Sequence, residues 1–174
     1  YFMGVLLALL LAAEAAPALP RCLVMVAEQD VGQSKAKYWW GGSSFATDLE
    51  VVENAMAEQL RAAGFTVVDR RLLEGKIKAT PAITSPDPTD SAIKEFAATS
   101  GAEVVFIGKA IAVDAGTVMG TPMHSPQATV SMRALSLDDA RIIASTATTQ
   151  VAAHVDGLTG GAKALQKAAG KAMD

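Results

Sequence analysis

The chain has 174 residues, 51% of them hydrophobic, and a formal net charge of −3 at pH 7. That length is enough to bury the core of one domain without disulfides or metal, and it makes a second domain improbable. Its lysines and arginines form no cluster that could release counterions from nucleic-acid phosphates, so nucleic acid is a poor candidate partner.

Residues 1–20 form an apolar leader. Its apolar block runs from Val5 to Ala13 and ends in small residues, including Ala13-Glu14-Ala15, a pattern that fits a signal-peptidase site. The block is shorter than the roughly 20 residues that a membrane-spanning helix requires. We therefore expect a secretory signal peptide, and with it a periplasmic location, outer-membrane association included.

The leader lacks the basic stretch that begins a typical signal. Either the chain begins inside the signal, or Tyr1 and Phe2 are added residues ahead of Met3. A third interpretation is a retained amphipathic or buried helix. In that case its apolar side must be covered, and packing of residues 5–13 against a second copy of the chain is one solution.

The segment after the leader is a short apolar strand, predicted over Cys22 to Ala27. The single cysteine cannot form an internal disulfide, and in this apolar run we expect it to behave as a small buried hydrophobe. Leu19-Pro20-Arg21-Cys22 resembles a lipid-attachment site only superficially, because the proline and arginine break that pattern. A polar loop is predicted from Glu28 to Ala46.

The stretch from Thr47 to Arg71 predicts a capped helix, a glycine stop and a strand. Thr47 and Glu50 have the spacing of a capping box, and Gly64 can take the left-handed position that ends a helix. Phe65 to Asp69 then has the composition of a covered strand. The helix has one apolar stripe, formed by Leu49, Val52, Met56, Leu60 and Ala63, and a polar side formed by Glu50, Glu53, Asn54, Glu58 and Arg61.

The next segment, from Arg71 to Asp90, contains three prolines and is predicted to be mostly connector, with one helical turn around Leu72 to Gly75. A second helix is predicted over Ser91 to Ser100, with Gly101 as its stop. Val104 to Gly108 is fully apolar, which is typical of a strand covered on both faces.

The last third of the chain predicts a long loop, a hairpin and a helix. The loop is expected over Ala112 to Gln127, where glycine and proline recur. Two long strands follow, Ala128 to Leu137 and Arg141 to His154, separated by an aspartate-rich turn, and their alternation predicts one wet face. A helix is expected over Ala162 to Met173, with Gly157 to Gly161 as a flexible entry.

These elements predict one α/β domain over residues 21–174, following the leader of residues 1–20. Its order is β-α-β-α-β-β-β-α, forming a mixed sheet of about five strands with helices on its faces.

Four segments of the sequence resemble a known family. They are AMAEQLRAAGFTVVDRRLL, GAEVVFIGKA, ATVSMRALSLDDARIIAS and GGAKALQKAAG. Over most of Arg21 to Asp174 the chain resembles the envelope domain family of the curli-secretion lipoprotein and of the middle domain of flagellar assembly protein T, whose fold is similar to the amino-terminal domain of TolB. The resemblance implies an exported protein that works by assembly at the bacterial envelope, and it brings no catalytic residues.

The curli-secretion relatives build a membrane pore from inserted hairpins, and such hairpins need strands of about 9 to 11 alternating residues. Neither Arg71 to Asp90 nor Ala112 to Gln127 alternates, and both are broken by proline or glycine. We therefore do not expect a transmembrane pore, and the flagellar member is the better guide.

The strongest candidate for a partner-binding site is Tyr38-Trp39-Trp40, because aromatic residues dominate interface energetics. Met119 and Met123 in the predicted second loop could extend this surface, since methionine adapts to the shape of a partner. The alternative is that the aromatic rings fold back onto the core and the methionines fill gaps.

Nothing in the sequence indicates catalysis. His124 and His154 lie far apart, without a cysteine or carboxylate cluster at ligand spacing, and no G-x-S-x-G motif is present. Arg70 and Arg71 are expected to form a solvated cluster with Asp69 or Glu74. We expect no metal, no cofactor and no enzymatic activity.

The sequence therefore favours a non-enzymatic periplasmic assembly or scaffold protein that binds a protein partner. The alternative is a module that binds a small ligand or peptide between the loops at Glu28 to Ala46 and Ala112 to Gln127. A binding module should have a concave pocket with convergent polar groups, whereas a scaffold should have an exposed apolar patch.

Overall fold

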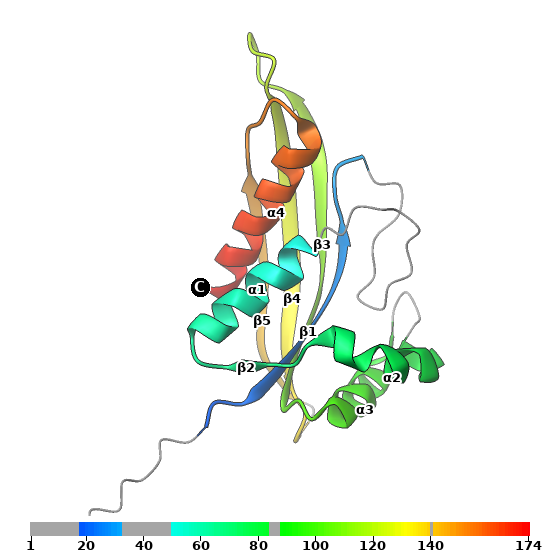
Figure 1. The fold of residues 1–174 in the computed structure, drawn as a ribbon. Coiled ribbons are helices and arrows are strands. Elements are labelled where there is room, and N and C mark those ends of the chain that lie inside the picture. The colour runs from blue at the N-terminus through cyan, green and yellow to red at the C-terminus, as the bar shows by residue number, and fades with distance from the viewer. Residues whose placement is uncertain (1–17, 33–49, 84–87, 140) are drawn as a thin grey trace, which may run out of the picture.

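The computed structural model describes residues 18–32, 50–83, 88–139 and 141–174. Within them the chain forms one mixed five-stranded sheet with helices on both faces, which confirms the predicted fold class (Figure 1). The strands are β1 (Arg21–Gln29), β2 (Thr66–Val67), β3 (Val104–Thr117), β4 (His124–Ser136) and β5 (Ile142–Val151). The helices are α1 (Val51–Ala62), α2 (Glu74–Ala79), α3 (Asp90–Ser100) and α4 (Gly157–Met173), with 3-10 turns at Arg70–Leu73 and Pro81–Ile83.

The sheet has the order β2-β1-β3-β4-β5. β1 is parallel to both β2 and β3, with the β1–β3 register running from Cys22 opposite Val104 to Gln29 opposite Ile111. β3, β4 and β5 form an antiparallel meander. The long hairpin of β3 and β4 projects beyond β1 at one end of the molecule, which we call the distal end (Figure 1).

One face of the sheet is covered along its length by α1 and α4. Val52, Met56 and Leu60 of α1 are buried there, as the predicted stripe requires, and Leu165 of α4 is fully buried beside them. Cys22 also lies in this core, fully buried as expected, and burial together with the nearby Glu103 carboxylate raises the pKa of its thiol to about 11. A thiol held protonated in this way is a packing group.

Among the described residues, the opposite face is covered only at the end away from the hairpin tip, which we call the proximal end. There α2, α3 and the two 3-10 turns pack on β1, β3 and β4. The residues that meet there are Leu23, Met25, Leu73, Ile77, Ile83, Ile93, Phe96, Val105 and Leu135.

The start of α1 differs from the sequence prediction. The helix begins at Val51 and Glu50 makes no capping bond, while Thr47 lies outside the described residues. The first N–H groups of the helix are instead satisfied by a side chain of β1. The buried Glu28 carboxylate accepts hydrogen bonds from the N–H groups of Val51 (3.3 Å) and Val52 (2.9 Å). The loop predicted from Glu28 is wrong at its start because β1 continues to Gln29.

Gly64 has φ +92°, which confirms it as the glycine that ends α1. The Phe65 N–H donates to the Leu60 carbonyl at 2.9 Å, the bond expected of such a stop. The strand that follows is shorter than predicted, covering only Thr66–Val67.

The predicted connector is largely helical, because the chain there folds into α2 and the two 3-10 turns that bury Leu73, Ile77 and Ile83. α3 agrees with the prediction. Thr89 caps it by accepting a hydrogen bond from the Ala92 N–H at 3.3 Å, and Gly101 ends it with φ +75°.

The loop predicted over Ala112 to Gln127 is wrong. β3 continues to Thr117 and β4 begins at His124, so this stretch forms the outer part of a hairpin. Glycine and proline therefore do not prevent strands here, as the sequence argument assumed, while the expectation that the chain forms no transmembrane pore stays a prediction. The two long strands that follow are confirmed, although β5 ends at Val151.

The flexible entry predicted for the last helix is also wrong, because α4 begins at Gly157. Asp156 caps it by accepting a hydrogen bond from the Thr159 N–H at 2.8 Å. Gly160 and Gly161 are buried inside its first turns.

Candidate functional site

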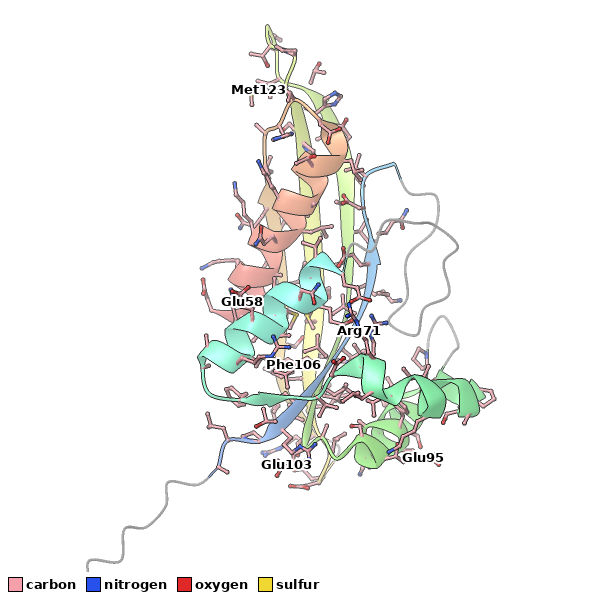
Figure 2. The ribbon with its side chains drawn as sticks, in the orientation of Figure 1. Glu58, Arg71, Glu95, Glu103, Phe106 and Met123 are labelled. Atoms are coloured by element: carbon pink, nitrogen blue, oxygen red, sulfur yellow. The ribbon has the colours of Figure 1, made fainter. Side chains whose placement is uncertain are left out.

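Of the five residues proposed for partner binding, the structure describes two. Met119 is 97% exposed at the turn between β3 and β4, and Met123 is half-buried at the same turn. Figure 2 shows Met123 at the distal end, opposite Glu95 and Glu103 at the proximal end. Tyr38, Trp39 and Trp40 lie outside the described residues, as do residues 5–13, so the predictions made for them stay predictions.

Hydrogen bonds define the conformation of the hairpin turn. The Val118 N–H donates to the Met123 carbonyl at 2.7 Å, and the Val118 carbonyl accepts from the Thr121 N–H at 3.0 Å and the Thr121 hydroxyl at 2.9 Å. Gly120 has φ +76°, a conformation that favours glycine. Met119 therefore lies in a turn whose conformation is fixed by hydrogen bonds, so its exposure is a property of the fold.

The distal part of β3 has its side chains arranged in an unusual way. Ala110 and Ala112 face α4 and are 0% and 4% exposed, whereas the bulkier Ile111 and Val113 face the other side and are 47% and 54% exposed. A strand with one wet face normally buries its larger apolar residues. Here the small residues are buried and the large ones lie on the surface.

The register places polar side chains of β4 beside these two residues and Val151 of β5 beyond them on the same face. Ile111 lies in a row with Thr129 and Thr149, and Val113 lies in the next row with Gln127 and Val151, which is 49% exposed. We call this group, on the face opposite α4, the distal face. No described helix packs on it, because α2 and α3 lie at the proximal end. Large apolar residues that lie exposed next to one another, as Ile111 and Val113 do, are typical of interaction sites.

Sequence reasoning missed these two residues because Val113 fell in the predicted loop and Ile111 lay between that loop and the predicted strand, assigned to neither. Alternation from Lys109 to Val113 was available as a signal, but the later Gly116, Gly120 and Pro122 were weighed more heavily. The structure places Gly116, with φ +101°, at an irregularity in the β3–β4 pairing, where a glycine is tolerated without ending the strand.

The two histidines support this end of the sheet. Their backbones exchange both N–H···O bonds, at 2.7 and 3.0 Å, and the His124 Nδ1 lies 2.6 Å from the Asp114 carboxylate. The pKa of Asp114 is lowered by the hydrogen bond from the Gly116 N–H and by the His124 side chain. Within the described residues, no group of three histidine, cysteine or acidic side chains is placed to hold a metal ion.

A concave region of about 220 Å³ lies between α1 and the segment after β2. Arg70 is one of the residues that line it, and its side chain is 12% exposed and paired with Glu50 and Glu53, the latter at 3.1 Å. Burial alone would lower the pKa of Arg70, but the Glu53 and Glu50 carboxylates raise it above its ordinary value. The expected solvated cluster with Asp69 or Glu74 is therefore wrong for Arg70, and so is the expectation that Glu50 and Glu53 face water. The cluster joins α1 to the segment after β2.

Asp30 is a second buried carboxylate that sequence reasoning missed. It is 1% exposed and accepts a hydrogen bond from the Val31 N–H at 2.6 Å. Burial raises its pKa, and Asp156 adds to that effect. Gly161 of α4 lies against it, so closely that a Cβ at this position would collide with the carboxylate. The signal in the sequence was a glycine pair inside a helical pattern, which indicates close packing.

Comparisons with known proteins agree with the fold. No protein-family model matches the sequence, and no curated protein matches it significantly. Among solved structures, lipoprotein GNA1162 of Neisseria meningitidis is 13% identical with a TM-score of 0.50, over 88% of this chain and 97% of that chain. A PelC dodecamer from Paraburkholderia phytofirmans is 15% identical with a TM-score of 0.47, over 88% and 91%, and the LpoB C-terminal domain from Salmonella enterica is 19% identical with a TM-score of 0.42, over 79% and 86%.

The chain thus shares its fold with a bacterial lipoprotein. These structures do not confirm the resemblance to the curli-secretion and flagellar families or to TolB, which stays a prediction. In the part of the chain that the structure describes, helices are too short or too polar to cross a membrane.

Proposed function

We propose that this chain is a non-enzymatic protein of the bacterial envelope, located in the periplasm, and that it binds a partner protein through its distal end. The observation that carries the proposal is the inverted strand: β3 buries Ala110 and Ala112 and leaves Ile111 and Val113 on the surface. Exposing the larger side chains is unfavourable in isolation, so a partner that covers them gains apolar burial.

Three further features support the proposal. Met119 extends the apolar surface to the tip of the hairpin, and methionine is suited to adaptable contacts. The Asp114–His124 pair and the α4 cap hold the distal end in one conformation, which lowers the entropy lost on binding. The apolar leader and the resemblance to envelope assembly domains favour export, and the fold is shared with a lipoprotein.

The alternative, a small-ligand module, finds less support in the described residues. The loop expected to form one wall of its site is a hairpin, and the cavity at Arg70 is occupied by charges that pair with one another. A ligand site would instead bring polar groups together for the ligand to bind.

Affinity capture of the exported protein from its native host, after crosslinking in the cell, tests the proposal. We expect a reproducible envelope protein that is lost with Met119→Asp, because the aspartate places a charge in the apolar contact. Leu72→Asp is the matched control, since Leu72 is 82% exposed on the 3-10 turn beside α2 and should not affect capture. Equal capture by both variants, or capture of no protein by the unmodified chain, would contradict the proposed surface.

A further inference from the structure

β5 ends the sheet and has backbone groups that point away from it. The Ala152 N–H donates to the Pro126 carbonyl at 3.1 Å, so this pair is of the hydrogen-bonded type. In an antiparallel ladder such pairs alternate with pairs that do not bond each other. The N–H and C=O groups of alternate β5 residues therefore point outward, and no strand in the described residues pairs with them. These residues are Ser145, Ala147, Thr149 and Val151.

The sequence of β5 itself lacks the devices that normally protect an exposed strand. Ile142 to Val151 reads IIASTATTQV, with no charged residue, no proline and many β-branched residues. Proteins usually protect such an edge with lysine, proline or a very short strand. At the opposite edge, β2 is only two residues long and pairs with Arg21 and Cys22 of β1. β5 is therefore competent to pair with another strand.

Lysines of α4 lie beside this edge. The helix packs along β5, with the Thr148 hydroxyl donating to the Ala168 carbonyl at 2.8 Å. The Lys167 ammonium donates to the Val151 carbonyl, one of the outward groups, at 3.4 Å. Lys163 and Lys171, four residues before and after Lys167, share its side of the helix, and all three are exposed. Lys171 also forms an exposed ion pair with Asp174 at 3.3 Å.

We propose that the β5 edge binds an extended acidic segment of a partner protein, which adds a sixth strand to the sheet. Alternate side chains of the added strand would face α4, where acidic residues meet Lys167 and Lys171. The others would lie beside Thr149 and Val151 and extend the distal face, where β-branched residues fit. This inference rests on the proposed function, because it names the chemistry of the partner.

A second copy of the chain is a poorer occupant of the same edge. Two β5 strands paired about a two-fold axis would place both α4 helices on one face of the joined sheet, with their lysine rows adjacent. Like charges so placed repel. The charge of the edge therefore favours an acidic partner over self-association.

Peptide binding by the purified chain tests this inference. The probe is a fluorescently labelled ten-residue peptide that alternates glutamate and valine, and its control alternates lysine and valine. We expect saturable binding of the first alone, measured by anisotropy. Lys167→Glu with Lys171→Glu should weaken it by about tenfold or more, because each change replaces attraction with repulsion. Lys76→Glu with Lys94→Glu, on α2 and α3, makes the same change in net charge away from β5. Absent binding, or equal binding by the charge variants, would overturn the inference.

The backbone contact is tested separately at Ala147. Ala147→Pro removes one outward N–H and no bond to β4, so the fold should persist, which a thermal melt verifies. Ala147→Val keeps the N–H. We expect the proline variant to lose the peptide and the valine variant to retain it. Equal binding by both would overturn the inference, as would a concentration-dependent dimer, seen by sedimentation velocity, that only the proline variant loses.

The two proposals can fail separately. If the glutamate peptide does not bind but capture in the cell still depends on Met119, the edge inference is wrong and the proposed function stands. If peptide binding and Met119-dependent capture are both absent, both are wrong.

Discussion

On the face of the sheet opposite α4, the proximal and distal halves are built from the same strands, but only the proximal half is covered by described helices. At the proximal end, Val105 and Leu135 are buried under Phe96 of α3. At the distal end, Ile111 and Val113 continue the same side of β3 and remain about half exposed. The apolar character of a strand therefore does not tell which part of it is core. That depends on where the chain places its next helix.

The face covered by α4 explains how the distal half stays folded without a second layer. Small residues meet there, with Ala110, Ala112 and Ala128 of the sheet packed against Ala164 and Ala168 of the helix. Small side chains allow a close approach, and the glycine pair at the start of α4 extends it. One tightly packed layer supports the distal half, which leaves the other face available for binding.

The largest expected effect is in the proximal core. Phe96→Ala should lower the free energy of unfolding by about 3–5 kcal/mol, because Phe96 is 2% exposed and its removal leaves a cavity. Val113→Ala, in the distal half, should cost about 1 kcal/mol or less, through strand propensity alone. Urea unfolding of both variants measures the difference. Similar losses would mean that the distal face is covered in the folded protein, contrary to the comparison.

The next effect tests the close packing of α4. Gly161→Ala should destabilise the protein by about 1–3 kcal/mol, because the added methyl group would collide with the buried Asp30 carboxylate and approach the Val31 side chain to 2.9 Å. Gly75→Ala is the matched helical control, since nothing lies within 4 Å of the added methyl group. It should be neutral or stabilising by up to about 1 kcal/mol. Thermal denaturation measures the melting temperature of both variants, and equal melting temperatures would contradict this account.

A smaller effect is expected at the start of α1. Glu28→Gln should cost about 1 kcal/mol, because the amide is a weaker acceptor for the N–H groups of Val51 and Val52. Glu58→Gln, on the exposed side of α1, removes the same charge without removing a cap and should leave unfolding in urea unchanged. Equal effects would show that the cap contributes nothing beyond charge.

The smallest effect concerns pH. Burial raises the pKa of Asp30 in the folded state, so the folded protein holds that proton to higher pH than the unfolded chain does. This favourable contribution is complete below the unfolded pKa and is lost as pH rises through the folded value. Asp30→Asn should therefore stabilise the protein at neutral pH, with the gain disappearing in acid. Urea unfolding across pH measures this, and a gain that persists in acid would refute the assignment.

The sequence predicted the parts of the fold that depend on local chemistry. Three features were predicted correctly, because capping and periodicity act over a few residues. They are the apolar stripe of α1, the glycine stops at Gly64 and Gly101, and the strands of the final hairpin. Errors arose where a distant residue supplied the missing contact. Glu28 caps α1 from strand β1. Asp30 lies against Gly161 of α4, and this contact, which requires a glycine there, exists only in the folded chain.

The candidate site was predicted in part. Met119 was proposed because methionine adapts to the shape of a partner, and it is exposed, which a contact residue needs, while its role in binding stays a prediction. The distal face was missed because the glycines and proline after Val113 favoured a loop from Ala112, and the predicted strand ended at Gly108, before Ile111. The β5 edge could not be recognised from a single strand, because only the strand order shows which strand ends the sheet.

The most direct test of the division between the two halves is site-specific photo-crosslinking in the native host. A photoreactive residue is placed at Val113 or Met119 in the distal half, and at Leu72 or Glu95 in the proximal half, all exposed positions. We predict that both distal positions yield the same crosslinked envelope protein and that the proximal positions yield none. Crosslinks confined to the proximal positions would contradict the assignment of recognition to the distal end.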